Sequence, residues 1–103
     1  KSGDAYGQRG NVYYKALQEC RSADISDDDR IIASLAHQSF KKAEENGYRR
    51  FNNSLLWLEE NEVLFGRTHW FMLDPKKQKQ GYVKPESECY NWVEKRLDKD
   101  SSW

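Results

Sequence analysis

The sequence predicts a small α+β domain, in which three to four helices accompany a short antiparallel β-hairpin. Three observations support this fold class. Apolar residues at three- and four-residue steps predict a long helix over residues 26–46. Residues that favour strands follow from Val63 to Leu73 and again from Gly81 to Lys84. The segment between these two runs, Asp74 to Gln80, is polar and rich in lysine, so we expect it to form the loop of the hairpin.

The length and composition set the size of the core. A chain of 103 residues is sufficient for one domain with a modest core. Only 37% of the residues are hydrophobic and 14% are aromatic, so the aromatic side chains must supply much of the buried area. We predict a flexible lead-in over the glycine-containing residues 1–10, one domain over residues 11–97, and a frayed tail over residues 98–103.

Capping residues indicate where the first two helices begin and end. Asn11 is the predicted N-cap of a first helix that ends near Ala23. Ser26 and Asp29 have the spacing of a capping box for the second helix, and Gly47 is its predicted stop. The predicted core face of the second helix is formed by Ile32, Leu35, Ala36, Phe40 and Ala43.

Two further helices are predicted in the second half of the chain. Asn52, Asn53 and Ser54 are candidate N-caps of a helix that buries Leu55 and Leu58. A last helix is predicted to begin at Pro85 and Glu86, because proline is favoured in a first helical turn. Its predicted inward residues are Tyr90, Val93 and Leu97.

An antiparallel meander with flanking helices is the alternative fold. In that fold the segments Leu55–Glu59 and Glu62–Gly66 pair through a turn at Glu60 and Asn61. Short apolar runs do not distinguish a helix from a strand by periodicity, so the sequence leaves both folds open.

Charge is balanced over the whole chain but segregated along it. Seventeen basic and seventeen acidic residues cancel, so no global field attracts a polyanion or an anionic membrane. Residues 64–85 contain five basic residues and a single acid, Asp74, whereas residues 24–62 contain nine acids and five bases. Any site for a polyanion must therefore be local.

The cysteines and the hydropathy bear on the compartment. Cys20 and Cys89 match no metal-binding spacing. We expect two free thiols in a reducing compartment, with a disulfide between them as the alternative. No apolar run approaches the ~20 residues that span a membrane, and no signal-peptide pattern opens the sequence. The expected location is the cytoplasm or the nucleus.

Part of the chain resembles the winged-helix superfamily. Leu55, Leu58 and the following acids resemble the end of a recognition helix that leads into a strand. The segments Trp70–Leu73 and Lys76–Lys79 resemble the strand and the tip of a wing. The resemblance implies a helix in a groove of duplex DNA and a wing on the DNA backbone. The residues that it places in contact with duplex DNA are Arg49, Arg50, Asn52, Asn53, Lys76, Lys77 and Lys79.

A protein-binding module is the alternative function. Glu59, Glu60 and Glu62 place negative charge near the proposed recognition helix, which disfavours DNA. Large apolar and aromatic side chains dominate the energetics of protein interfaces. The candidate interface residues of this kind are Leu56, Trp57 and Trp92, and the sequence is also compatible with a homo-oligomer.

The sequence contains no recognisable catalytic, cofactor-binding or metal-binding motif. His37 lies on the predicted second helix and His69 lies beside Trp70, and neither has a ligand-type residue at a useful spacing. We therefore predict a non-enzymatic protein with no cofactor and no metal site.

Overall fold

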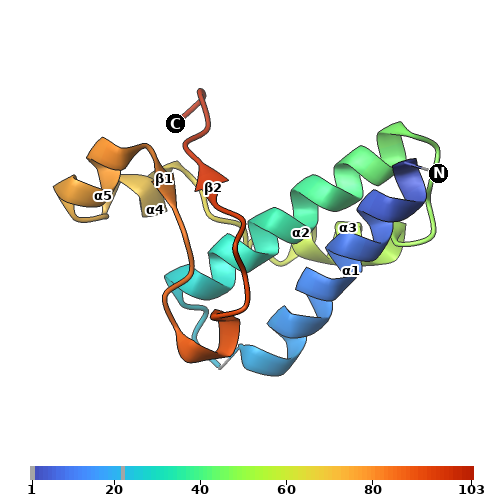
Figure 1. Cartoon of the computed structure of the whole chain (residues 1–103), viewed down its shortest axis with the longest axis horizontal. Helices are drawn as coiled ribbons and strands as arrows, with labels where there is room; N and C mark the ends of the chain where they lie inside the picture. The colour runs from blue at the N-terminus through green and yellow to red at the C-terminus, as the bar shows by residue number, and fades with distance from the viewer. Residues whose placement is uncertain (1, 22) are drawn as a thin grey trace.

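The computed structural model describes residues 2–21 and 23–103 and is mostly helical (Figure 1). The helices α1 and α2 lie side by side and antiparallel, and a small antiparallel sheet follows them. This architecture confirms a small α+β domain. The elements are α1 (Ser2–Cys20), α2 (Asp27–Glu45), α3 (Asn52–Glu60), α4 (Arg67–Phe71), α5 (Pro75–Gln80), β1 (Tyr82–Val83), the 3-10 helix η1 (Glu88–Tyr90) and β2 (Leu97–Asp98).

Helix α2 forms as predicted and carries the centre of the core. Ser26 is its N-cap, and its side chain accepts a hydrogen bond from the Asp29 amide at 3.1 Å. The Asp29 carboxylate accepts one in return from the Ser26 amide at 3.1 Å, which completes the capping box. Gly47 follows the helix with a φ of +82°, a conformation in which glycine has no steric penalty. The predicted core residues Ile32, Leu35, Ala36, Phe40 and Ala43 are all buried.

The prediction of a flexible lead-in is wrong for residues 2–10, which form the first half of α1, while Lys1 lies outside the described residues. The reason is that Gly3, Gly7 and Gly10 fall on one face of the helix. A Cβ atom on Gly7 would lie 2.5 Å from the Tyr48 ring, and one on Gly10 would lie 2.7 Å from the Phe40 ring. The glycines therefore allow close packing, and α1 ends at Cys20 instead of near Ala23.

The strand predicted over residues 63–73 and the loop predicted over residues 74–80 are also wrong. Residues 67–71 form α4, and residues 75–80 form α5. The Asp74 side chain caps α5 by accepting from the Lys76 amide at 2.9 Å, Pro75 occupies the first turn, and Gly81 ends the helix with a φ of +82°. These residues are ordinary start and stop signals of a helix. The lysine-rich segment is therefore a helix and not the loop of a hairpin.

The sheet joins different segments from those predicted. The strand β1 lies inside the predicted run 81–84, but it pairs antiparallel with β2, in the register Tyr82–Asp98 and Val83–Leu97. The hairpin with residues 63–73 is therefore absent. The alternative meander is wrong as well, because residues 55–59 belong to α3. The predicted cap of α3 is also wrong, since Phe51 occupies the N-cap position without a side-chain hydrogen bond.

The C-terminal segment after β1 contains the 3-10 helix η1 and the strand β2 but no α-helix, so the last predicted helix is wrong. Tyr90, Val93 and Leu97 are nevertheless buried as predicted. The tail over residues 98–103 was also predicted to be frayed. In the structure, however, the Trp103 ring packs 5.7 Å from the rings of both Phe65 and Trp70. The path of this segment is therefore fixed by the contacts of these side chains with the core. A helical backbone is not needed.

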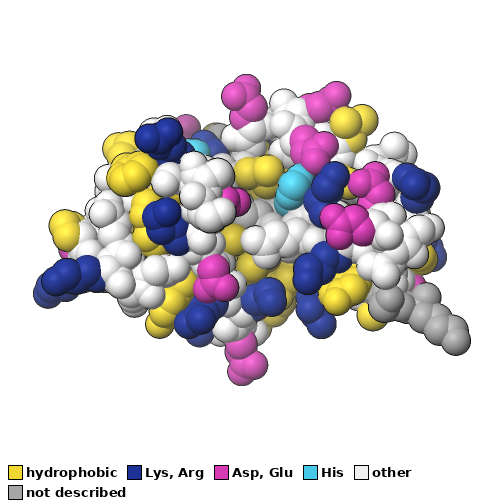
Figure 2. Space-filling model, turned by 90° about the horizontal axis from the view of Figure 1, so that it is seen from above, with side chains coloured by type: hydrophobic (Ala, Val, Ile, Leu, Met, Phe, Trp, Pro, Cys, Tyr) yellow, Lys and Arg dark blue, Asp and Glu magenta, His cyan; other side chains and the backbone are white. Residues whose placement is uncertain are grey.

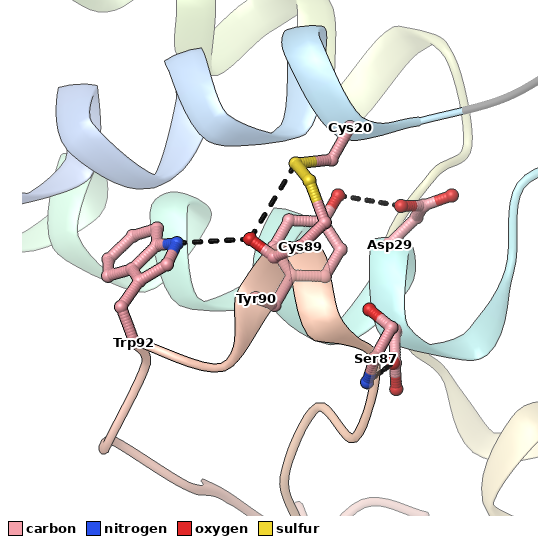
Figure 3. Close-up of a disulfide and its surroundings, with 7 residues drawn as sticks. Cys20, Asp29, Ser87, Cys89, Tyr90 and Trp92 are labelled. Carbon is pink, nitrogen blue, oxygen red and sulfur yellow. Dashed lines mark hydrogen bonds between the residues drawn. A yellow bond between two sulfur atoms is a disulfide. The ribbon is translucent and has the colours of Figure 1, made fainter.

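A disulfide and two aspartates attach this segment to the first two helices (Figure 3). Cys20 and Cys89 are bonded to each other, so the expectation of free thiols is wrong. With a sequence separation of 69 residues, such a cross-link stabilises the folded state by about 4 kcal/mol in the loop-entropy model. The Asp28 carboxylate accepts from the amides of Glu86 and Ser87 at 3.0 and 2.7 Å.

The Tyr90 hydroxyl donates a 2.6 Å hydrogen bond to the other oxygen of the Asp29 carboxylate, and both residues are buried. Burial raises the pKa of Tyr90, and the hydrogen bond to Asp29 and the negative charge of Asp29 raise it further. The native state therefore favours the neutral phenol over the phenolate.

Substitution of Gly10 by Ala tests the packing of α1 on α2. Alanine favours a helix over glycine by up to about 1 kcal/mol, but the new Cβ would meet the buried Phe40 ring at 2.7 Å. Overpacking of this kind costs about 1–3 kcal/mol. We therefore expect a lower free energy of unfolding in urea, with exposed Lys15→Ala as the control. A Gly10→Ala variant as stable as the wild type would contradict the close contact.

Substitution of Tyr90 by Phe tests the bond to Asp29. We expect a loss of about 1.5–3 kcal/mol at neutral pH, because a buried carboxylate loses a donor. The raised pKa adds a stabilisation that is complete below the ordinary tyrosine pKa of about 10 and is lost as the pH rises above it. Denaturation measured from pH 8 to pH 11 should therefore show a smaller alkaline decline for Tyr90→Phe than for the wild type. Tyr13, whose pKa burial also raises, should contribute to the decline that remains.

Candidate functional site

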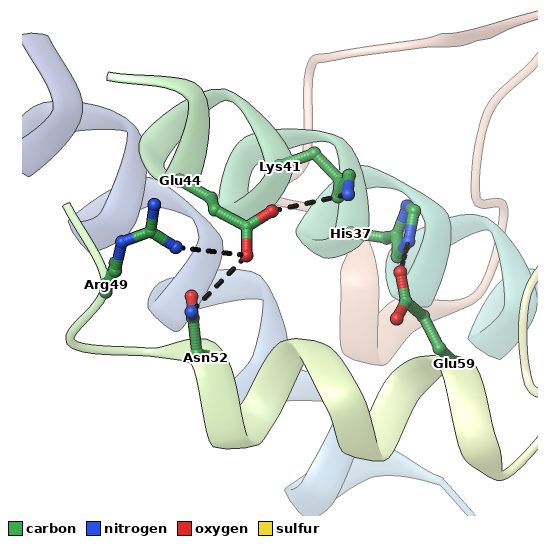
Figure 4. A network of polar contacts seen from close by, with 6 residues as sticks. All are labelled: His37, Lys41, Glu44, Arg49, Asn52 and Glu59. Carbon is green, nitrogen blue, oxygen red and sulfur yellow. Dashed lines mark hydrogen bonds and ion pairs between the residues drawn. The ribbon is translucent and has the colours of Figure 1, made fainter. Parts of the chain in front are cut away.

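The residues predicted at the helix entrance lie at the turn between α2 and α3 (Figure 4). Glu44 of α2 occupies the centre of this group. Its carboxylate accepts a hydrogen bond from the Asn52 side chain at 3.3 Å and lies 3.9 Å from the Arg49 guanidinium. Arg50 and Asn53 are exposed. An acid from another helix thus offsets part of the positive charge that the sequence suggested.

The three lysines predicted for the wing lie on α5, at the other end of the long axis of the molecule (Figure 1). Lys76 and Lys79 are exposed, whereas Lys77 forms a 3.1 Å ion pair with Glu86. The molecule measures 39 Å along its longest axis. The structure therefore does not bring the helix-entrance residues and the wing lysines onto one compact surface.

The predicted apolar interface residues do not form one surface either. Trp57 is half-buried, with its ring against Tyr14 at 5.9 Å and beneath Arg21 at 5.3 Å. Trp92 is 47% exposed and stacks on Tyr13 at 6.1 Å. Consecutive residues of a helix point about 100° apart, so the two tryptophans lie on different flanks of α1. The third predicted residue, Leu56, is 50% exposed on α3.

The two histidines have structural partners. The His37 Nε2 atom lies 2.8 Å from a carboxylate oxygen of Glu59, which links α2 to α3 (Figure 4). The Nδ1 atom of His69 accepts from the Gly66 amide at 2.9 Å at the start of α4, and burial lowers the pKa of His69. Among the described residues, no group of three or more His, Cys, Asp or Glu side chains could hold a metal ion. The described part of the chain also contains no helix with the length and apolar character to cross a membrane.

The most exposed large apolar side chains lie together at the end of α4. Phe71 is 55% exposed and Met72, the next residue, is 81% exposed. Neighbouring Trp70 is buried, so the short helix has one face in the core and these two side chains in solvent. We define the α4–α5 surface as Phe71 and Met72 with the three exposed basic residues of these helices, Arg67, Lys76 and Lys79.

One amide side chain holds the two helices of this surface together. The Gln78 Nε2 group of α5 donates to the carbonyl oxygens of Trp70, Phe71 and Leu73, at 3.2 to 3.3 Å. These carbonyl groups lie in and just after the last turn of α4, where helix carbonyls otherwise lack intrahelical partners. Gln78 thus fixes α5 against the backbone that carries Phe71 and Met72.

The α4–α5 surface is positively charged as well as apolar. At this end of the molecule, hydrophobic and basic side chains lie side by side (Figure 2, left). The Arg67 guanidinium lies 5.7 Å from the centre of the Phe71 ring. Lys76 and Lys79 are three residues apart in a helix, so they share a face. None of these three cations forms an ion pair with a described residue.

A groove of about 360 Å³ lies between the start of α2, α5 and β1. Its apolar lining includes Ile31, Phe65 and Val83. Three of the charged groups around it already have partners within the chain, since Lys77 pairs with Glu86 and Asp28 accepts from two backbone amides. Small-molecule sites usually offer polar groups that are available to the ligand. The groove is therefore a weaker candidate than the α4–α5 surface.

A scan against protein-family models, a search of curated proteins and a search of solved structures each returned no match.

The sequence interpretation missed Phe71 and Met72 because it placed them in a two-sided strand. The signals that could have found them are Asp74, Pro75 and Gly81, which mark α5 as a helix. Once residues 75–80 are helical, the wing is excluded. The run Trp70–Leu73 then has too few inward positions to bury all four side chains.

Substitution of Gln78 by Ala tests whether this side chain fixes α5 against α4. The amide can donate two hydrogen bonds, each with a net contribution of about 1 kcal/mol. We therefore expect faster amide hydrogen exchange in α5 and a loss of about 1–2 kcal/mol in stability. Lys79→Ala, at an exposed position of the same helix, is the matched control. Equal exchange in both variants would mean that Gln78 does not hold the helix.

Proposed function

We propose that this protein is a non-catalytic protein-binding module that contacts its partner through the α4–α5 surface. The observation that carries the proposal is the exposure of two consecutive large apolar side chains, Phe71 and Met72, at the end of a short helix in which Trp70 is buried. Aromatic side chains and methionine are enriched at protein interfaces, and a few such residues supply most of the binding energy. The hydrogen bonds from Gln78 reduce the flexibility of this surface before binding, which limits the entropy lost on association.

The disulfide supports a proposal about the compartment. Disulfides persist in oxidising environments and are rare in the cytosol and the nucleus. We therefore propose that the protein folds and acts in an oxidising compartment, instead of the cytoplasm or nucleus suggested by the sequence.

The winged-helix resemblance supplies a second candidate function, the binding of duplex DNA. In that case α3 would lie in a groove, and the lysines of α5 would contact phosphates in place of a wing. Unpaired Lys76 and Lys79 favour this candidate. Two features oppose it: the helix entrance lies at the far end of the molecule, and Glu44 offsets the charge there. Protein binding also accounts for Phe71 and Met72, which DNA binding leaves unexplained.

Replacement of Phe71 and Met72 together by Gln tests the protein-binding proposal. Glutamine preserves helix propensity and removes the apolar contact. Partner complexes are captured on the immobilised intact protein, treated with nuclease and identified by mass spectrometry. Sedimentation of the free protein detects a second copy of this chain as the partner. We expect the double variant to weaken the complex by about 2 kcal/mol or more.

Leu56→Gln is the matched control, because Leu56 is also a large exposed apolar residue, at 50%, but lies on α3. Circular dichroism and thermal unfolding establish that all variants fold. Equal retention of the partner by the double variant would exclude the α4–α5 surface. Loss of the partner with Leu56→Gln alone would indicate that the interface lies on α3. Loss of the complex on nuclease treatment would favour the DNA candidate.

A further inference from the structure

We infer that the partner presents an acidic segment with large apolar side chains to the α4–α5 surface. This inference rests on the proposed function and adds the chemistry of the partner to it. Two independent properties of the surface lead to it, namely the exposed apolar pair and the cations around that pair.

The cations are available to a partner. Arg67, Lys76 and Lys79 are exposed and form no ion pair with a described residue. The single acid within residues 64–85, Asp74, is the N-cap of α5, where its carboxylate accepts the Lys76 amide. The nearby Lys77 is already neutralised by Glu86 at 3.1 Å. The surface is therefore cationic, and a partner with acidic side chains would neutralise it.

The exposed apolar pair indicates that the partner offers apolar side chains as well as negative charge. The Arg67 guanidinium lies 5.7 Å from the centre of the Phe71 ring, and Gln78 ties α5, the helix that carries the two lysines, to the Phe71 carbonyl. A nucleic acid backbone would leave the Met72 side chain, at 81% exposure, without an apolar contact. A peptide segment that alternates acidic and large apolar residues satisfies both properties. Its apolar side chains would cover Phe71 and Met72 while its carboxylates meet the lysines.

Fluorescence anisotropy with synthetic peptides tests this chemistry. The first probe is an acidic apolar peptide of Glu, Leu and Phe. Three variants of this peptide have the acids replaced by Gln, the acids replaced by Lys, or the apolar residues replaced by Ser. Duplex DNA is a fifth probe. We expect the acidic apolar peptide to bind at least about tenfold more tightly than every other probe, a difference of about 1.4 kcal/mol.

Charge reversal on α5 sharpens the test. The variant with Lys76→Glu and Lys79→Glu should bind the acidic apolar peptide about tenfold more weakly than the wild type does. It should bind the lysine-containing apolar peptide more tightly. The matched control reverses two cations at the far end of the molecule, Arg49→Glu with Arg50→Glu. We expect this control to bind as the wild type does.

Several results would overturn the inference. They are equal binding of the acidic and Gln peptides, the absence of binding to any peptide, and an unchanged preference after charge reversal on α5. Tighter binding of duplex DNA that survives the Phe71→Gln and Met72→Gln change would identify a polyanion site instead. A separate result would contradict the proposed function itself: the double variant would still bind the natural partner as tightly as the wild type does.

Discussion

The hydrogen bond between Tyr90 and Asp29 joins the C-terminal segment to α2, and the path of this segment depends on it. One carboxylate serves two purposes here: it closes the capping box of α2 with Ser26, and it receives the Tyr90 hydroxyl. Tyr90 follows Cys89 directly, so the covalent bond to Cys20 and the hydrogen bond to Asp29 act on adjacent residues. Together they hold an extended segment, which contains little regular structure of its own, against the helical core.

The attachment of this segment permits the small sheet and the position of α5. Once the segment is held at residues 86–90, the chain continues to β2, which pairs with β1 directly after α5. Trp103 then packs against Phe65 and Trp70, on either side of the start of α4. The buried face of α4 is thus covered by the end of the chain. The face with Phe71 and Met72 is left in solvent.

The protein binding proposed here requires no large conformational change. The core side of α4 is fixed by Trp70, and its end is fixed by Gln78. The α4–α5 surface is small, so for the proposed complex we expect an interface at the lower end of the range of specific complexes. In such interfaces a central apolar pair supplies affinity, while a cationic rim selects the partner and speeds encounter. The disulfide adds to the stability that the core supplies.

The amino-acid sequence alone determined those parts of the fold that depend on neighbouring residues. It predicted α2 with its capping box and Gly47 stop, the helical nature of α3, the short strand near Tyr82, and the burial of Tyr90, Val93 and Leu97. Local signals also marked α5 through Asp74, Pro75 and Gly81, although the interpretation as a wing overlooked them.

Tertiary structure decided what depends on partners far away in the sequence. Gly3, Gly7 and Gly10 by themselves suggest a flexible segment. In the folded chain they allow α1 to pack closely against Tyr48 and Phe40. The charge of Arg49 is offset by Glu44 of another helix, and Cys20 meets Cys89 only in the folded chain. The exposure of Phe71 and Met72 was set in the same way, because which side of a short apolar run is buried depends on what packs against it.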